Sequence, residues 1–197
     1  MNRWLLHPWA KPLLWLLLAA PLAWLTWAAW QDQLGANPAE ALLRSLGDWT
    51  LRMLCLTLAI SPLRDWTGAS GWLRLRRNLG VATFIYATLH WLAYAWFDQG
   101  LDLPALWADV TKRPFILVGT AAWLAMVPLA ATSFNAAIRW LGGRAWKDLH
   151  KVTYALGPLA LLHFFWMRAG KQDFLEVALY ALVIGALLGW RRFKPQG

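Results

Sequence analysis

Three histidines lie where the chain is most apolar, and they are its best candidates for chemistry. His150 and His163 are thirteen residues apart on one apolar segment, and His90 lies two apolar segments earlier. A helix rises about 1.5 Å per residue, so this spacing corresponds to about 20 Å along the axis. The two side chains would then lie at different depths of a hydrocarbon layer about 30 Å thick. Because neutral imidazole ligates haem iron, the spacing favours haem at two depths, which would carry electrons across a membrane.

The composition predicts that membrane-spanning helices position these histidines. Of the 197 residues, 59% are hydrophobic, 15% are charged and 17 are Trp. Apolar runs recur at the length that a spanning helix needs, which a soluble core would not require. We therefore predict an all-α, multi-pass bundle that forms one domain over residues 1–197. Its six spans are expected at about 11–30, 46–63, 79–97, 114–133, 151–167 and 175–190. The first is longer than a signal-peptide core and is predicted to be retained.

The basic residues predict the orientation of these spans. With the N-terminus in the cytoplasm, 13 of the 19 Lys and Arg lie on the cytoplasmic side, Lys194 among them. The other side holds six, namely Arg44, Arg52, Lys112, Arg113, Arg168 and Lys171. Since cytoplasmic loops carry the excess of Lys and Arg, both termini are predicted to be cytoplasmic. Topology and contacts with lipid headgroups thus account for the net charge of +9 without a nucleic-acid partner.

With this topology the histidines form one pair and one single residue. His90 and His163 reach similar depths in the outward half of the bilayer, and two imidazoles from different helices are what a six-coordinate b-type haem requires. His150 lies at the cytoplasmic mouth of the fifth span. In a straight helix His150 and His163 are about 140° apart around the axis. Either the helix bends, for which Gly157 and Pro158 are candidates, or the two sites flank it on different sides.

Other reactive side chains offer less. Arg76 and Arg77 precede His90 by fourteen and thirteen residues, at the inner depth, where a guanidinium could meet haem propionates, a flavin phosphate or the face opposite His150. The alternative is a cytoplasmic topology anchor. Cys55 is expected to be a buried apolar residue, since the chain has no CxxC motif. The sequence also contains no GxGxxG, P-loop or HExxH motif, and its carboxylates fall in loops or at span ends, which argues against a proton relay.

The order of several short motifs resembles that of the ferric-reductase-like transmembrane family over nearly the whole chain. They are Gly35-Ala36-Asn37-Pro38 with Glu40, Gly47 and Trp49-Thr50-Leu51, Ser61-Pro62-Leu63, Arg76-Arg77-Asn78-Leu79-Gly80, His90, Lys112-Arg113-Pro114 with Gly119, Thr132-Ser133, and Trp146-Lys147-Asp148-Leu149-His150 with Tyr154 and His163. The resemblance is strongest to members that serve a periplasmic methionine sulfoxide reductase and carry no fused flavin domain.

The resemblance implies an electron-transfer subunit in a bacterial inner membrane rather than a catalytic subunit. Its donor would be quinone or a cytoplasmic flavin reductase, and its acceptor a periplasmic molybdopterin-containing methionine sulfoxide reductase that repairs oxidised proteins. The haem-binding positions would be His90, His150 and His163, with one or two b-type haems. FMN would be a second cofactor, and Arg76 and Arg77 would lie near the inner cofactor. Because the third span has one histidine rather than two, that inner site could hold a bis-histidine haem, a haem with a weak second ligand, or a flavin.

Two other functions stay open as hypotheses. A membrane ferric or quinone reductase of the same architecture would reduce its acceptor without a periplasmic molybdoenzyme. A non-redox transporter or assembly factor would use the histidines only to pack helices, and the purified protein would be colourless. A periplasmic partner would contact the short outer loops, residues 31–45 and 98–110.

Overall fold

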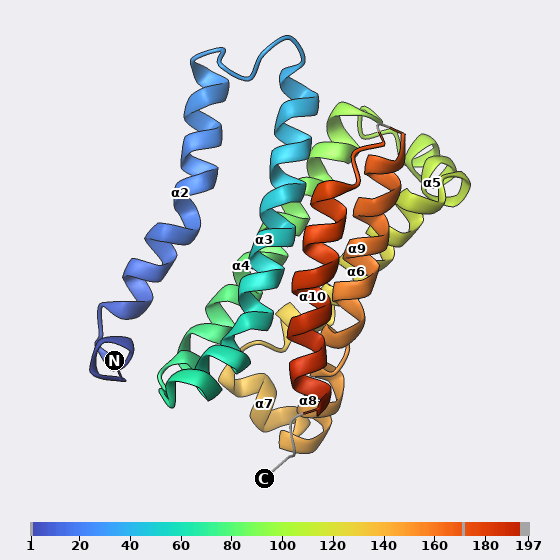
Figure 1. The fold of residues 1–197 in the computed structure, drawn as a ribbon. Coiled ribbons are helices and arrows are strands. Elements are labelled where there is room, and N and C mark those ends of the chain that lie inside the picture. The colour runs from blue at the N-terminus through green and yellow to red at the C-terminus, as the bar shows by residue number, and fades with distance from the viewer. Residues whose placement is uncertain (1, 171, 194–197) are drawn as a thin grey trace. The chain divides into compact units, whose positions relative to one another are not determined.

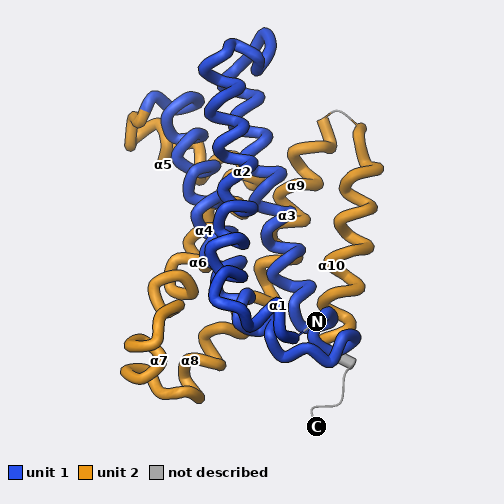
Figure 2. Tube along the Cα trace, turned by 90° about the vertical axis from the view of Figure 1, so that its left-hand side faces the viewer, with its two compact units in different colours: residues 1–100 blue, residues 101–197 orange. Residues whose placement is uncertain are grey.

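The structure is a computed structural model that describes residues 2–170 and 172–193, with side chains up to Arg191. Regular structure in these residues is entirely α-helical, which confirms the predicted all-α class. Lys171 and Lys194, which enter the count of basic residues, lie outside the described residues. The chain separates into two compact units, residues 1–100 and 101–197, which are described one at a time (Figure 2).

The first unit consists of α1 (Asn2–Leu6), α2 (Ala10–Trp30), α3 (Pro38–Thr67) and α4 (Trp72–Phe97). The three long helices alternate in direction, and α3 and α4 lie side by side along most of their length (Figure 1). Their core includes Met53 and Ile60 of α3 with Tyr86 of α4. The Tyr86 hydroxyl donates to the carbonyl of Leu18, 2.7 Å away, and so ties α4 to α2.

The ends of α3 have clear local causes. Asn37 caps the first turn, because its Oδ1 accepts from the Glu40 N–H at 3.2 Å, and Pro38 suits the first helical position. The helix stops at Gly68, whose φ of 64° is left-handed. α3 therefore starts eight residues before the predicted span 46–63, because charged residues in its first turns lower the hydropathy without breaking the helix.

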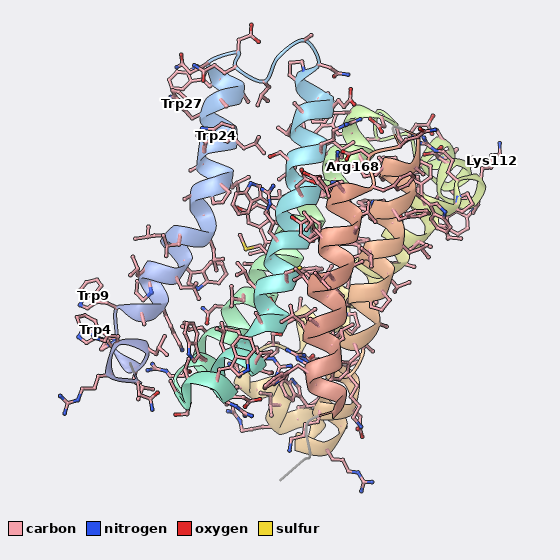
Figure 3. The ribbon with its side chains drawn as sticks, viewed as in Figure 1. Trp4, Trp9, Trp24, Trp27, Lys112 and Arg168 are labelled. Atoms are coloured by element: carbon pink, nitrogen blue, oxygen red, sulfur yellow. The ribbon has the colours of Figure 1, made fainter. Side chains whose placement is uncertain are left out.

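The second unit consists of α5 (Leu103–Lys112), α6 (Pro114–Ala131), α7 (Asn135–Leu141), α8 (Gly143–His150), α9 (Thr153–Ala169) and α10 (Leu175–Phe193). α9 contacts both α6 and α10, and α5 contacts α6. Arg168 at the end of α9 binds Asp173 at 3.0 Å and Glu176 at 2.5 Å, which fixes the turn into α10. Arg168 and Lys112 lie at the same end of this unit (Figure 3).

Each predicted span overlaps one long helix, whereas the predicted connections were partly wrong. The range 64–78 is not a loop, since α4 begins at Trp72 and includes Arg76 and Arg77. The short helices α1, α5, α7 and α8 occupy ranges expected to be a tail or loops. Hydropathy locates apolar stretches but does not detect short polar helices such as α8, which exposes Arg144 and Lys147.

The membrane setting is supported most directly by α2 and α6. Among the described residues, these two helices have the length and hydropathy to cross a membrane by themselves, yet only 17% of each apolar window is buried. A core helix of a soluble protein would be mostly buried. Exposed Trp4 and Trp9 lie towards one end of α2, and Trp24 and Trp27 towards the other (Figure 3). Trp at both ends of an apolar helix is typical of membrane interfaces.

Candidate functional site

His90 lies on α4 and contacts the main chain of α3. Its Nδ1 is 3.0 Å from the carbonyl oxygen of Leu43. Its ring packs against Gly47, where a Cβ would lie 3.0 Å from Cε1 and 3.3 Å from Nδ1. The imidazole is partly buried and rests directly on the helix backbone. Helix α3 thus provides both the space for the ring and the acceptor for one of its nitrogens.

His163 lies on α9 and contacts α6 in the same way. Its Nδ1 is 2.7 Å from the carbonyl oxygen of Phe115. A Cβ at Gly119 would lie 2.8 Å from Nδ1 and 2.9 Å from Cε1. The Phe115 ring is tilted by 39° against the imidazole, with centroids 6.5 Å apart. His163 is therefore held even more closely than His90.

The two histidine contacts share one sequence spacing. In each unit the accepting carbonyl belongs to the residue four positions before the glycine, Leu43 before Gly47 and Phe115 before Gly119. Residues four apart lie on the same helix face, so ring and carbonyl meet on one side of the helix. We refer to these two arrangements as the α3 seat and the α6 seat.

The seats fit a histidine that ligates haem iron. A main-chain carbonyl only accepts hydrogen bonds, so the neutral ring donates from Nδ1–H and its lone pair is on Nε2. Metal-ligating histidines usually donate their other ring N–H to a carbonyl or carboxylate, which fixes the tautomer and the ring orientation. Within the described residues, no group of three or more His, Cys, Asp or Glu could hold a bare metal ion.

His150 is held differently from the other two. It is the last residue of α8, and its Nε2 is 3.2 Å from the Thr132 hydroxyl. Its ring stacks on Trp146 at a centroid distance of 4.0 Å, and the Trp146 indole N–H donates to the Thr132 carbonyl at 2.9 Å. His150 thus lies at the far end of α6 from the α6 seat. Thirteen residues separate Gly119 from Thr132, so the two histidines are about 20 Å apart along α6.

The expectation that His150 and His163 share one helical segment was wrong. α8 ends at His150 and α9 begins at Thr153. Across the junction, Lys151 and Val152 donate to carbonyls three residues earlier, at 3.1 Å each, instead of four. The interruption is therefore at 151–152 and not at Gly157 and Pro158, which lie within α9. Two separate helices position the histidines, so the rotation calculated for a straight helix does not apply.

The charged candidates lie near the helix ends. Arg76 is partly buried and Arg77 exposed, both in the second turn of α4, where their neighbour Arg74 donates to the Leu6 carbonyl at 2.6 Å. Next to His150, the Lys151 ammonium is 2.6 Å from Asp148, and the hydrogen bond together with the carboxylate charge raises the pKa of Lys151. Arg76 belongs to the first unit and His150 to the second, so a shared site for these two residues stays a prediction.

Sequence reasoning identified the histidines but not the groups that hold them. The partners of His90 and His163 are the main-chain carbonyls of Leu43 and Phe115, and because every residue has such a carbonyl, the residue types could not indicate them. Gly47 and Gly119 do stand among the motifs of the resemblance, and a glycine inside an apolar helix is the signal that could have indicated close approach of a ring. Thr132 and Trp146 are also in those motifs, and both now have a role beside His150.

Comparison with known proteins gives a consistent result. The family model described as ferric reductase like transmembrane component matches residues 46–161. A protein of Polaromonas naphthalenivorans is 56% identical over 96% of this chain and 87% of its own length. Relatives from Ralstonia nicotianae and Xanthomonas campestris pv. campestris are 51% and 45% identical, over 90% and 89% of this chain and 82% of each relative. All three are named protein-methionine-sulfoxide reductase heme-binding subunit MsrQ. No solved structure matches the chain.

Proposed function

The chain belongs to the ferric reductase like transmembrane component family, and we propose that it is the haem-binding, electron-transferring membrane subunit of a methionine sulfoxide reductase system. The observation that carries the proposal is the pair of seats, in which His90 and His163 each direct Nδ1 to a main-chain carbonyl across a glycine. The names of the relatives support the haem and the reductase system. In this proposal electron transfer is the activity of the chain, and sulfoxide reduction belongs to its partner.

His90 and His163 would ligate one b-type haem through Nε2. The iron of that group, when bound, supplies reversible one-electron chemistry between its ferric and ferrous states. The carbonyls of Leu43 and Phe115 hold the Nδ1 proton, which makes Nε2 a better electron donor and keeps each ring from rotating.

Three further residues would serve an inner cofactor. His150 lies at the end of α6 that is predicted to be on the cytoplasmic side. Arg76 and Arg77 carry positive charges that suit haem propionates or the phosphate of FMN. Ligation of iron by His150 would require its Nε2 to exchange the Thr132 hydroxyl for the metal. A second haem and FMN are therefore alternative occupants of this inner site, and the family likeness favours the presence of FMN.

The setting would be a bacterial inner membrane that the chain crosses six times, with both termini cytoplasmic. Either quinone or a cytoplasmic flavin reductase would donate the electrons, and a periplasmic molybdopterin-containing catalytic subunit (MsrP) would accept them. Lipid, and no nucleic acid, would cover the remaining surface. The exposed apolar side chains of α2 and the count of basic residues support this arrangement.

The test is a visible absorption spectrum of the detergent-purified chain before and after dithionite, with a pyridine haemochrome count of haem per protein. We expect a Soret band that shifts on reduction and sharp α and β bands, as a low-spin b-type haem gives. A colourless protein made with adequate haem supply would leave only helix packing for the histidines, as in a transporter or assembly factor. A haem protein that reduces ferric chelates or quinone but not a periplasmic molybdoenzyme would favour the membrane reductase alternative.

A further inference from the structure

We propose that Gly47 and Gly119 are positioning residues for the two haem ligands, so that the absence of a side chain at these two positions sets the orientation and the donor strength of His90 and His163. This inference rests on the proposed function, because it assigns a role to residues beside the proposed ligands. It goes beyond that function by stating which helix positions determine the properties of the bound group.

The first step is steric. A Cβ at Gly119 would lie 2.8 Å from Nδ1 and 2.9 Å from Cε1 of His163, closer than real Cβ contacts occur. At Gly47 the corresponding distances to His90 are 3.3 Å and 3.0 Å, so a Cβ there would require a smaller shift of the ring. The contacted atoms belong to the imidazole itself. A methyl group at either position therefore displaces the ring that would bind iron.

The second step concerns the carbonyls. In an α-helix a side chain lies over the turn that precedes its own Cα, which is the turn of the residue four positions earlier. A side chain at Gly47 would therefore cover the Leu43 carbonyl, and one at Gly119 the Phe115 carbonyl. Each carbonyl has two lone pairs and can accept both the N–H of its helix and the imidazole Nδ1–H. Glycine at this spacing uncovers the second lone pair.

The third step is that glycine has no intrinsic reason to be in these helices. Glycine destabilises a helix interior relative to alanine. Three other helical glycines have room for a methyl group: a Cβ at Gly80 would lie 3.9 Å from the nearest atom, on Thr57, and no atom lies within 4 Å at Gly185 or Gly189. Of these five helical glycines, only Gly47 and Gly119 approach an imidazole, one in each unit.

The experiment compares Gly119→Ala and Gly47→Ala with the matched controls Gly80→Ala and Gly185→Ala in the full-length, detergent-purified chain. Two quantities are measured: the g values of the low-spin ferric signal in electron paramagnetic resonance, which report ligand orientation, and the rate of haem transfer to apomyoglobin. Helix content by circular dichroism checks that each variant is folded.

We expect shifted g values and faster haem transfer in both seat variants. Loss of a partner that orients a metal ligand weakens metal binding roughly 10–100-fold, and Gly119→Ala should be affected more than Gly47→Ala because its clash is closer. The controls should match the wild type. If Gly119→Ala does not fold, the milder Gly47→Ala decides the question.

Unchanged g values and haem transfer in the folded seat variants would overturn the inference. It would also be overturned if haem is lost while the haem that stays bound keeps wild-type g values, because that is general destabilisation. A wild-type protein without haem, by contrast, refutes the proposed function itself. The two failures are therefore distinguishable.

Discussion

The three histidines show how one side chain acquires different chemistry from its hydrogen-bond partner. A carbonyl can only accept, so it fixes the tautomer of His90 and His163. The Thr132 hydroxyl donates its one proton to the Pro128 carbonyl, 2.7 Å away, so towards His150 it acts as the acceptor and favours a proton on Nε2. The stack of His150 on Trp146 holds the ring in place without selecting a nitrogen. His90 and His163 therefore have the tautomer that the proposed ligation through Nε2 requires, whereas Nε2 of His150 would first have to give up its contact with Thr132.

The histidines can be separated by substitution. His90→Ala and His163→Ala should each abolish the same low-spin haem absorption, because a six-coordinate haem loses its low-spin state when either ligand is removed. His150→Ala should leave that absorption intact and change a different signal or none. The measurement is the reduced α band per protein in detergent, and His7→Ala in the N-terminal tail is the control. Equal partial losses from all three intramembrane variants would contradict the pairing.

Sequence reasoning at the residue scale could only select side chains of the right chemical type, and whether these histidines bind haem stays a prediction. His90, His150 and His163 stand out as polar residues in an apolar chain, and all three are in organised contacts. The partners could not be predicted, because two of them are main-chain carbonyls and two are glycines, which become meaningful only when a second helix lies against them. Cys55 is half-buried in α3, between the buried and exposed positions that its neighbours occupy.

At the scale of elements, α3 and α4 are held together by a hydrogen bond between two hydroxyls as well as by apolar packing. The Thr57 and Thr83 hydroxyls are 3.2 Å apart in the buried interface, and each also lies within 2.9 Å of a carbonyl of its own helix. Two hydroxyl protons serve these three contacts, so one contact lacks a proton at any time. The pair is therefore a weak clamp between helices that carry the α3 seat and His90.

A double-mutant cycle measures this clamp. Thr57→Val and Thr83→Val should each lower the free energy of unfolding by less than about 1.5 kcal/mol, with a coupling energy of about 0.6 kcal/mol, as for other polar pairs between membrane helices. The measurement is unfolding of the detergent-solubilised chain followed by circular dichroism. Thr26→Val on exposed α2 is the control, because the Thr26 hydroxyl donates to the Leu22 carbonyl of its own helix, 2.8 Å away. A coupling above about 2 kcal/mol would mean that the hydroxyls hold the interface more strongly than polar pairs between membrane helices do.

The start of α3 makes a second prediction at this scale. Asn37→Ala removes the acceptor for the Glu40 N–H and should lower the free energy of unfolding by about 1 kcal/mol. Because the α3 seat begins only six residues later, fraying should also loosen His90. The comparison is Asp102→Ala, which removes the equivalent cap of α5 at Ala105. Equal destabilisation by both, with haem loss only for Asn37→Ala, is the expected pattern in thermal denaturation read by absorbance, and haem loss in both would argue against a local effect.

Hydropathy predicted the six long helices but neither the short ones nor the helix ends. The apolar ranges all became helices, since a chain in lipid has to satisfy its backbone within each segment. Caps and charged first turns decide the ends, and these lie outside an apolar window, as Glu40 and Arg44 do in α3. The junction at 151–152 depends on a change from four-residue to three-residue hydrogen bonds, for which the sequence has no distinctive residue.

At the scale of the whole molecule, the distribution of charge predicts the orientation. The cytoplasmic side would hold 13 of the 19 basic residues, and eight of the ten acidic residues would lie on the other side. The exposed charges of α8, Arg144 and Lys147 with Asp148, fit a helix at the surface of the membrane rather than within it. Orientation matters for function, because the α6 seat and His150 lie at opposite ends of α6 and would then lie towards opposite sides of the membrane.

Labelling of single cysteines tests this orientation. In a Cys55→Ala background, Gln33→Cys lies between α2 and α3 and Arg144→Cys lies on α8, and both positions are exposed. If the chain crosses the membrane at α2, α3, α4 and α6, the two positions are on opposite sides. A membrane-impermeant maleimide added to spheroplasts should therefore modify Gln33→Cys at once and Arg144→Cys only after lysis. Modification of both in intact spheroplasts would mean an even number of membrane crossings between them, and the reverse pattern would place the N-terminus outside. Asp98→Cys is the control, because it is expected on the same side as Gln33→Cys. Its labelling separates an error in the crossings at α3 or α4 from an error at α6.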